Sequence, residues 1–414
     1  MIRIGIVGCG RILAAHLRGY RLLREAGIGD FQITALCARN ENDALGYVKR
    51  GEGPEQRRAV SDIEGDPLSI EDEYLSDFQK DIDVRIYTDY KRMIADGPID
   101  AVNDFTTHGL HHLVAKETFS HGKHLMTQKP LAATIRAARQ MCDQAEKSGV
   151  TFGVFENARN RPNTRYTRWA FDKGPCGDIQ FLMNGNVGTF WAPDRIVAQT
   201  PWRHKLIEGG GISLDIGVHL FDMIRHIAGE IVAVSATTSV LEKTRYTRDP
   251  NGEVTASVEC DADDIFIGTF ETEAGATGSL ITSWGGHGTS TVIGKGPVYY
   301  GSKGRVTGNK VNLDDGSEHS LENLYQDHCG KEQIERDFPH GLTSDFALAQ
   351  NDWLEAIRHG QQPETDGREG LLDLACAYAM VESNLAKRTI EVTEVLSGDI
   401  REYQNPIDTH FGLE

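Results

Sequence analysis

The spacing of apolar residues divides the chain into two parts with different patterns of elements. In the first part, continuous apolar runs alternate with stretches of helical spacing, starting with Ile2–Val7 and a helical pattern over Ala14–Leu23. Continuous runs between helices are typical of a parallel sheet covered on both faces. The pattern predicts an α/β domain with a doubly wound parallel sheet. Its further strands are expected at Ile33–Cys37, from Arg85, from Ile99, at Leu125–Leu131 and at Val150–Phe155.

In the second part, strand-like runs outnumber helical patterns, which predicts an α+β domain with a large, mostly antiparallel open sheet. These runs are Ile179–Phe190, Ile231–Val240, Ile265–Glu273, Ala276–Trp284 and Pro297–Tyr300. Helical patterns start at Ser213 and cover Asp345–Arg358 and Gly370–Leu385, with a turn-rich connector over 361–369. We expect a first domain over 1–155 with an acidic surface insertion at about 50–83, a second over 156–392, and a C-terminal extension over 393–414 suited to wrap a neighbouring subunit.

The composition excludes several classes of partner. The 414 residues carry a formal net charge of -18, which disfavours nucleic acid or an anionic membrane as a partner. The seven cysteines are scattered without a CxxC pair, so neither a disulfide framework nor a zinc knuckle is indicated. His108, His111 and His112 lack a carboxylate or cysteine at matching spacing, and we expect no metal. Without a leader or a membrane-length apolar run, the protein is expected to be cytoplasmic.

A glycine turn follows the first strand. In a dinucleotide-binding unit, the first glycine permits the turn and the second lets the pyrophosphate approach the backbone at a helix N-terminus. Leu13 stands where a third small residue is usual, so an ordinary glycine turn is the alternative. The second predicted strand follows at the distance expected of a βαβ unit, which favours a cofactor loop. Its candidate contacts are Gly8, Gly10, Arg11 and Ile12.

The end of the second strand bears on the choice between NAD and NADP. An acidic residue here would bind the ribose 2′-hydroxyl of NAD, but this chain has Ala38 followed by Arg39. An arginine offers a cation to a 2′-phosphate, which favours NADP over NAD as the cofactor. The alternative is an exposed surface arginine.

Lys129 ends another predicted strand of the first domain. Pro130 favours an extended conformation at the lysine, which places it at the carboxyl end of a parallel strand, where open α/β sheets bind ligands. A lysine at this position could donate a hydrogen bond to a substrate hydroxyl.

Three polar residues share a face of the helix that is predicted to start at Ser213. Asp215, His219 and Asp222 follow one another at i, i+4 and i+7 among residues that are apolar nearly all round. This helix is therefore expected to be buried, and its polar stripe needs a chemical reason. Two interpretations of this stripe are possible. Its residues are either catalytic, or they are core residues whose polar groups are satisfied by hydrogen bonds.

Several short motifs follow one another along the chain. They are the Gly8/Gly10 turn, Thr88-Asp89-Tyr90, a strand ending in Thr106 with His111 beyond it, Gln128-Lys129-Pro130, Arg159 with Pro162, Trp202-Arg203 and GGGISLDIGVHLFD. Together these motifs resemble the glucose-fructose oxidoreductase and inositol dehydrogenase family (Gfo/Idh/MocA), from the first residue to about Val392. The family usually has glutamate where this chain has Gln128, and proline where it has Thr107.

The resemblance implies an NAD(P)-dependent oxidoreductase that exchanges hydride with a hydroxyl or carbonyl carbon of a sugar, glycoside or polyol. It assigns general base chemistry to His219, a hydrogen bond to the reacting oxygen to Lys129, and binding of a neighbouring hydroxyl to Asp215. It implies a homodimer or homotetramer that associates through the outer face of the large sheet. Further cofactor contacts would be Thr106, His108, His111, Gln128 and Lys129, and further substrate contacts Arg159, Trp202 and Arg203.

Two other functions stay open. One is a glycosidase-like or lyase-like enzyme in which tightly held nicotinamide oxidises a sugar transiently. The other is a non-catalytic dinucleotide-binding protein, against which the joint presence of Lys129, Asp215 and His219 argues.

Overall fold

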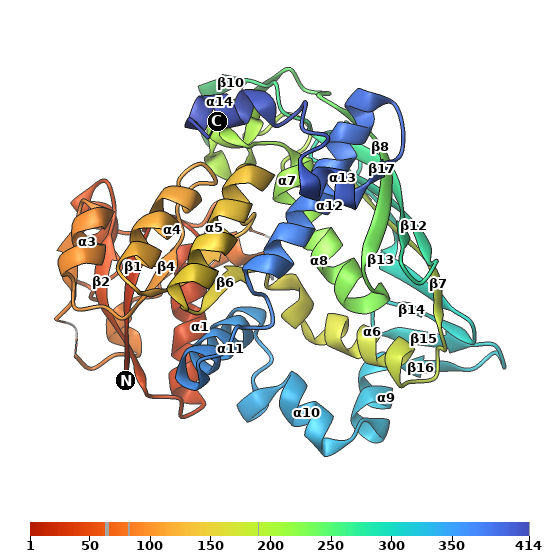
Figure 1. Cartoon of the computed structure of the whole chain (residues 1–414), viewed down its shortest axis with the longest axis horizontal. Helices are drawn as coiled ribbons and strands as arrows, with labels where there is room; N and C mark the ends of the chain where they lie inside the picture. Colours follow the sequence, from red (N-terminus) through yellow and green to blue (C-terminus); the bar gives the residue numbers. More distant parts are fainter. Residues whose placement is uncertain (63–65, 82, 189, 414) are drawn as a thin grey trace. The chain divides into compact units, whose positions relative to one another are not determined.

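The computed structural model describes residues 1–62, 66–81, 83–188 and 190–413. Its contacts divide the chain into two compact units, each with its own sheet (Figure 1). We call them the first unit and the second unit. The first comprises residues 1–133, 137–160 and 338–371, and the second comprises residues 134–136, 161–337 and 372–414.

The first unit contains a six-stranded parallel sheet in the order β3-β2-β1-β4-β5-β6. This order reverses direction at β1, as in a doubly wound dinucleotide-binding fold, and it confirms the predicted fold of the first domain. The strands are β1 Ile2–Val7, β2 Phe31–Cys37, β3 Arg85–Tyr87, β4 Ala101–Asp104, β5 His124–Gln128 and β6 Phe152–Phe155.

Helices in this part of the chain follow the predicted spacing. Leu13, Leu17 and Tyr20 of α1 are completely buried, as expected for residues spaced along one helix face. The carboxylate of Asp89 accepts a hydrogen bond from the Lys91 amide at 2.9 Å and caps α3. The helices are α1 Leu13–Glu25, α2 Glu41–Leu45, α3 Tyr90–Asp96, α4 His111–Ser120, α5 Ile135–Ser148 and α11 Asp345–His359.

A late segment of the chain, residues 338–371, belongs to the first unit. Its helix α11 packs against α1, and the two lie side by side in Figure 1. The Thr365 carbonyl then accepts a hydrogen bond from the Val154 amide at 2.8 Å, beside β6. The predicted division placed this segment in the second domain, because a helical pattern reports an apolar face but not the element that covers it.

The predicted acidic insertion is partly anchored to the first unit. Its residues 63–65 and 82 lie outside the described residues. Glu73 is buried and pairs with Arg21 of α1 at 3.0 Å. The amide group of Gln79 bonds with both the N–H and the C=O of Ile33 at 3.0 and 2.9 Å. The second half of the insertion therefore packs on α1 and β2, and includes the short 3₁₀ helices Pro67–Ser69 and Leu75–Asp77.

The second unit contains a nine-stranded sheet in the order β16-β15-β14-β13-β7-β12-β11-β8-β17. Among the described strands of this sheet, only β12 and β7 pair in parallel. The predicted, mostly antiparallel sheet is therefore confirmed. Residue 189 of the predicted strand Ile179–Phe190 lies outside the described residues. The strands are β7 Ile179–Val187, β8 Ile231–Ser239, β11 Ile265–Thr272, β12 Thr277–Ser283, β13 Thr291–Gly301, β14 Gly304–Thr307, β15 Lys310–Leu313, β16 Glu318–Ser320 and β17 Ile390–Glu391, with a separate hairpin of β9 Thr244–Arg248 and β10 Val254–Glu259.

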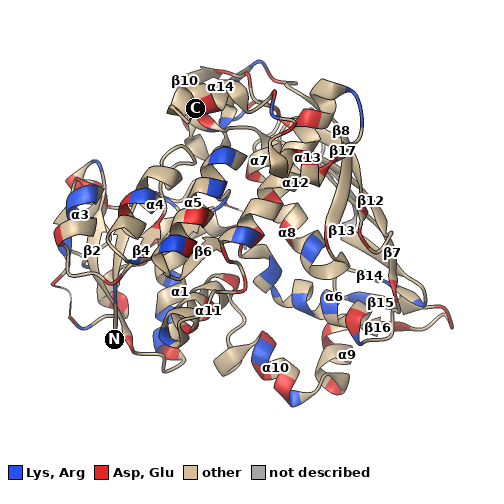
Figure 2. Cartoon of the chain, viewed as in Figure 1, with Lys and Arg blue, Asp and Glu red and all other residues tan. Residues whose placement is uncertain are grey.

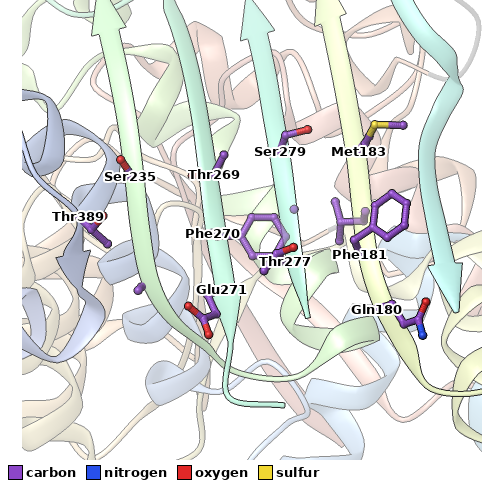
Figure 3. Close-up of a pocket in the computed structure, with 13 residues that line it drawn as sticks. Gln180, Phe181, Met183, Ser235, Thr269, Phe270, Glu271, Thr277, Ser279 and Thr389 are labelled. Carbon is purple, nitrogen blue, oxygen red and sulfur yellow. The ribbon is translucent and has the colours of Figure 1, made fainter. Parts of the chain in front are cut away.

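One face of this sheet carries a shallow groove (Figure 3). Burial alternates along β11, so Phe266 and Phe270 are buried while Ile267 is half exposed. At Gly278, a Cβ atom would lie 2.4 Å from the Phe270 ring, so the glycine lets that ring reach the floor of the groove. The groove is lined by residues of β7, β8, β11 and β12, including Phe181, Met183, Ser235, Thr269 and Ser279.

The C-terminal tail packs on its own unit. The Glu382 carboxylate accepts a hydrogen bond from the Tyr403 amide at 3.1 Å, and the Gln404 side chain accepts one from the Ile135 amide at 2.9 Å. Residues 393–414, predicted as an extension, are therefore an integral part of the second unit. The helices of this part of the chain are α6 Pro162–Asp172, α7 Ile212–Asp215, α8 Gly217–Ala228, α9 Leu321–His328, α10 Lys331–Asp337, α12 Gly367–Ala386, α13 Val392–Ser397 and α14 Asn405–Phe411.

The surface charge is mixed. Figure 2 shows acidic and basic residues interspersed along helices such as α5 and α10. Among the described residues, no helix combines the length and the apolar character needed to span a bilayer. The seven cysteines are all free thiols.

Candidate active site

The glycine turn after β1 has the geometry of a dinucleotide cradle. Gly8 has φ +99°, and a Cβ atom here would lie 2.6 Å from the carbonyl group of Phe105, so only glycine fits. At Gly10, by contrast, a Cβ atom would meet nothing within 4 Å. The first glycine permits the close turn and the second leaves open space above the backbone, which fits the approach of a pyrophosphate.

The start of α1 suits an anionic group. The N-cap position, Ile12, supplies no side-chain hydrogen bond to the helix, and first-turn N–H groups have no intrahelical acceptor. Two contacts fix the turn from outside. The Tyr47 hydroxyl donates to the Gly10 carbonyl at 2.9 Å, and the Arg11 guanidinium donates to the Arg58 carbonyl at 2.7 Å. The second contact comes from the insertion, which the sequence pattern did not indicate.

The residues after β2 differ in exposure. Ala38 is buried, and its amide donates to the Tyr87 carbonyl at 3.1 Å, whereas Arg39 is exposed. Asn40 caps α2 by accepting from the Asn42 amide at 3.1 Å. The strand end therefore presents a small residue and then a solvated guanidinium.

His111 joins two of the loops at the carboxyl ends of the strands. Its Nδ1 lies 3.1 Å from the Pro130 carbonyl oxygen, and its Nε2 lies 3.3 Å from the Thr106 carbonyl oxygen. The Thr106 hydroxyl in turn donates to Asp104 at 2.7 Å. The ring is completely buried, and so is most of His108. These contacts make His111 a structural link between the loops after β4 and β5.

Lys129 is the first residue after β5, as the strand pattern predicted, and it is partly buried. Its amide donates to the side-chain oxygen of Gln128 at 3.1 Å. The nitrogen of the same Gln128 amide lies 2.7 Å from Nε2 of His16, a residue of α1. His16 was not among the residues predicted to form the site, although a lone histidine on the apolar face of α1 was a visible signal.

In the second unit, the predicted continuous helix is broken. α7 ends at Asp215, Ile216 has φ −106°, and α8 starts at Gly217. A Cβ atom at Gly217 would lie 2.8 Å from the Met380 methyl group, so Met380 of α12 packs closely on the glycine. Asp215 therefore lies on a different helical segment from His219, which is partly buried, and Asp222, which is fully buried.

Asp215 is held together with two predicted substrate contacts. Its carboxylate accepts a hydrogen bond from Nε of Arg203 at 3.2 Å. The guanidinium of Arg203 also lies over the ring of Trp202, 4.5 Å from its centre, and donates to the Thr200 hydroxyl at 2.5 Å. Trp202 and Arg203 belong to the 3₁₀ helix Pro201–His204. A carboxylate, a guanidinium and an indole in contact form a surface suited to a polyhydroxylated ligand.

A buried carboxyl group anchors the start of α7. Asp263 accepts from the amide and the hydroxyl of Ser213 at 3.0 and 2.7 Å, and it is 5% exposed. Burial raises the pKa of Asp263 to about 6. A Cβ atom at Gly211, which has φ +111°, would lie 2.3 Å from this carboxylate. The glycine run in the sequence therefore makes room for Asp263, whose role the sequence did not indicate.

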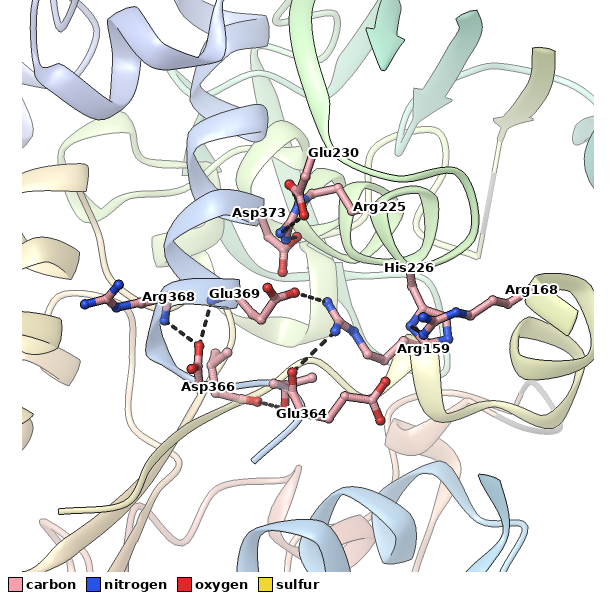
Figure 4. Close-up of polar contacts among 12 residues, drawn as sticks. Arg159, Arg168, Arg225, His226, Glu230, Glu364, Asp366, Arg368, Glu369 and Asp373 are labelled. Carbon is pink, nitrogen blue, oxygen red and sulfur yellow. Dashed lines mark hydrogen bonds and ion pairs between the residues drawn. The ribbon is translucent and has the colours of Figure 1, made fainter. Parts of the chain in front are cut away.

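Arg159 is engaged inside the first unit. Its side chain is 5% exposed and pairs with Glu369 at 2.9 Å, and it also reaches the Glu364 carbonyl at 3.4 Å (Figure 4). A buried Arg225 in the second unit pairs in the same way with Asp373 at 2.6 Å. Both arginines therefore have structural partners, and a substrate contact by Arg159 stays a prediction.

Among the described residues, no three His, Cys, Asp or Glu side chains are grouped so that they could hold a metal ion. The open glycine turn, the uncapped start of α1 and the parallel sheet define a dinucleotide-binding protein. The family model for the NAD-binding Rossmann fold of the GFO/IDH/MocA oxidoreductases matches residues 68–156, and the GFO/IDH/MocA C-terminal domain model matches residues 153–307. The chain belongs to the Gfo/Idh/MocA family of oxidoreductases.

Several relatives of this chain are named as dehydrogenases of sugars or polyols. D-xylose dehydrogenase of Paenarthrobacter nicotinovorans is 28% identical over 48% of this chain and 51% of its own length. Levoglucosan dehydrogenase of Pseudarthrobacter phenanthrenivorans is 27% identical over 50% and 55%. The chain thus spans about half the length of these two relatives. Myo-inositol 2-dehydrogenase of Thermotoga maritima is 23% identical over 95% of this chain and 100% of its own length.

Solved structures support the same fold. A levoglucosan dehydrogenase in complex with NADH and L-sorbose has a TM-score of 0.73 and 18% identity, covering 95% of this chain and 100% of that one. A second structure, the WlbA dehydrogenase from Bordetella pertussis in complex with NADH and UDP-GlcNAcA, has a TM-score of 0.66 and 21% identity, covering 94% and 97%.

Proposed function

We propose that this protein is a cytoplasmic NAD(P)-dependent oxidoreductase that transfers hydride between nicotinamide and a hydroxyl or carbonyl carbon of a sugar, glycoside or polyol. The observation that carries the proposal is an open glycine turn after β1 together with Lys129 after β5, at the same carboxyl edge of one parallel sheet. The names of its relatives support the substrate class.

In this reaction, three side chains and the bound cofactor would have separate roles. A bound nicotinamide supplies the hydride acceptor or donor. We assign to Lys129 a hydrogen bond to the reacting oxygen, and to His219 the acceptance and return of the hydroxyl proton. Asp215, oriented by its 3.2 Å contact with Arg203, would bind a neighbouring hydroxyl of the substrate.

For the cofactor, we propose NADP in preference to NAD. The support is Ala38, which places no carboxylate at the end of β2, and the exposed guanidinium of Arg39. Fluorescence titration should give tighter binding of NADPH than of NADH. In Arg39→Ala, NADPH affinity should fall by about tenfold while NADH affinity changes little. Equal losses for the two cofactors would contradict the proposal.

We further propose that the grooved face of the large sheet associates with a second copy of the chain, giving a homodimer or homotetramer. The support is the apolar character of its exposed residues, with Phe181 and Ile267 being 40% and 50% exposed. Analytical ultracentrifugation should show a dimer or tetramer that dissociates in Ile267→Glu and persists in Val254→Glu, a control at an equally exposed position of β10.

One experiment tests the reaction against its rivals. Absorbance of reduced nicotinamide is followed during incubation with a panel of sugars, glycosides and polyols, together with analysis of the products. Net reduction of the cofactor supports the dehydrogenase. Product without net reduction indicates transient oxidation by a glycosidase-like or lyase-like enzyme. Binding of NAD(P)H with neither signal across the panel would leave a dinucleotide-binding protein and contradict the proposal.

A further inference from the structure

His16 occupies an unusual position for an ionisable residue. Its side chain is 0% exposed and lies inside the first unit among aromatic rings. It stacks on Phe105 with ring centres 3.7 Å apart, and it meets the edges of Phe155 and Phe346 at 4.2 and 5.1 Å. This apolar enclosure holds the pKa of His16 well below its usual value, so the imidazole is neutral at physiological pH.

The hydrogen bonds around Gln128 fix the tautomer of that imidazole. The Gln128 oxygen accepts from the Lys129 amide at 3.1 Å, so its NH₂ group must point to Nε2 of His16, 2.7 Å away. Nε2 is then an acceptor without a proton, and the ring proton resides on Nδ1. Nδ1 has no hydrogen-bond partner among the described residues. His16 is thus held in one neutral form by a single polar contact.

We propose that His16 and Gln128 form a neutral positioning pair that fixes the backbone of Lys129 at the end of β5. The chain of contacts runs from the imidazole, through the two ends of one amide, to the N–H of the lysine. This inference rests on the proposed function of Lys129. His16 and Gln128 act through Lys129 and are positioning residues.

The amide of Gln128 satisfies both of its neighbours, which a carboxylate at this position would not do. A glutamine donates and accepts at once, so it satisfies both Nε2 of His16 and the Lys129 amide. An ionised carboxylate only accepts, and would require the opposite tautomer of His16 or a buried imidazolium. It would also place a negative charge one residue from Lys129. Pairing Gln128 with a neutral histidine keeps this strand end free of charge on either partner.

Two isosteric variants separate positioning from packing. His16→Gln retains an acceptor for the Gln128 amide, whereas His16→Met has nearly the same size and helix propensity but cannot accept strongly. Both variants lose the ring stacking equally. For the purified full chain, we expect kcat to fall by about tenfold in His16→Met and by about twofold in His16→Gln, with similar melting temperatures and unchanged NAD(P)H dissociation constants. Equal kcat values for the two variants would overturn the proposal.

Gln128→Glu provides a second variant with a different readout. It retains the acceptor for the Lys129 amide but adds a charge, so the pH profile of kcat/KM should shift relative to that of the wild type. A profile superimposable on the wild-type one would also count against the pair, because a merely structural glutamine predicts no shift.

A measurement without turnover keeps this test separate from the proposed function. In protein labelled with ¹⁵N-histidine, a long-range ¹H–¹⁵N correlation should show one imidazole in the Nδ1–H tautomer from pH 5 to 8. This signal should be missing in His16→Gln. An Nε2–H tautomer or titration in this range would overturn the pair even if the enzyme oxidises sugars. The expected signal with no turnover on any substrate would instead remove the proposed function alone.

Discussion

In the first unit, histidine and glutamine side chains near the carboxyl ends of the strands contact neutral groups. His111 lies between carbonyl oxygens at 3.1 and 3.3 Å, and His16 and Gln128 form the uncharged pair described above. In the second unit, ionisable groups hold the corresponding residues. Asp215 contacts Arg203, and Asp263 anchors the start of α7.

Because of this difference, we expect the folding stability of the two units to depend on pH in different ways. A neutral hydrogen bond contributes the same stability at every pH at which its partners keep their protons. A buried carboxyl with a raised pKa does not, because the folded state holds its proton more tightly than the unfolded state. Besides Asp263, burial raises the pKa of Glu382, which anchors the C-terminal tail, to about 7. The two units should therefore respond to pH in opposite directions. The depressed pKa of His16 costs the first unit stability as pH falls below the usual histidine value, whereas the raised pKa values of Asp263 and Glu382 cost the second unit stability as pH rises towards 7.

The largest expected effect comes from Asp263→Asn. Raising the pKa from 3.8 to about 6 means that stability is full below the ordinary value and is lost as pH rises through 6. The wild type should lose about 3 kcal/mol from this group between pH 3 and pH 8, a loss absent from the variant. Urea denaturation at both pH values measures the difference. Glu253→Gln, at an exposed site, is the control, and a slope unchanged in Asp263→Asn would refute the assignment.

His219→Ala tests whether proton transfer belongs to the second unit. We expect kcat to fall by about a hundredfold or more, or about 2.7 kcal/mol, because a positioned base is lost. NAD(P)H affinity should persist, since the glycine turn lies in the first unit. His287→Ala, whose side chain is 80% exposed, is the control. Wild-type turnover in His219→Ala would remove that residue from the role.

Gly10→Ala tests the cofactor cradle without disturbing the fold. The added methyl group has no neighbouring protein atom within 4 Å, but it occupies the space that we propose for the pyrophosphate. NAD(P)H affinity should fall by about tenfold at an unchanged melting temperature. Gly330→Ala also adds a methyl group in open space and should leave the affinity unaltered. The same affinity in both variants would show that the pyrophosphate lies elsewhere.

The smallest expected effect is that of Thr365→Val. The Thr365 hydroxyl donates to the Val154 carbonyl at 2.8 Å in a buried, neutral contact of the first unit. Its removal should cost about 1 kcal/mol of unfolding free energy, equally at pH 5 and pH 8. Thr365→Ser retains the hydroxyl and should cost less. A strongly pH-dependent cost would break the proposed contrast between the units.

Most of the fold was predictable because its signals are local. The strand, glycine turn and helix at the start of the chain and the positions of the main strands all follow from neighbouring residues. The break at Ile216 did not follow, because the helical spacing of apolar residues continues through Ile216 and Gly217.

The residue types of the proposed site could be read from the sequence, whereas their contacts could not. Lys129 lies at the strand end where Pro130 indicated. However, the partners that orient the polar residues are distant in sequence. His16 and Gln128 are 112 residues apart, and Arg159 and Glu369 are 210 residues apart. A pattern of apolar spacing contains no information on such pairings, so a buried partner of Arg159 could not be foreseen.

The return of residues 338–371 to the first unit has a consequence for biosynthesis. The Asp366 backbone bridges to Gly153 at the edge of β6, and Phe346 of α11 packs on Phe155 with ring centres 5.4 Å apart. At ordinary translation rates, roughly 10 to 40 seconds separate the synthesis of β6 from that of α11. The first unit is thus completed late in translation, although its synthesis starts first. Until α11 has been synthesised, the apolar surface that α11 covers stays exposed. A fragment that ends after β6 would expose that surface permanently.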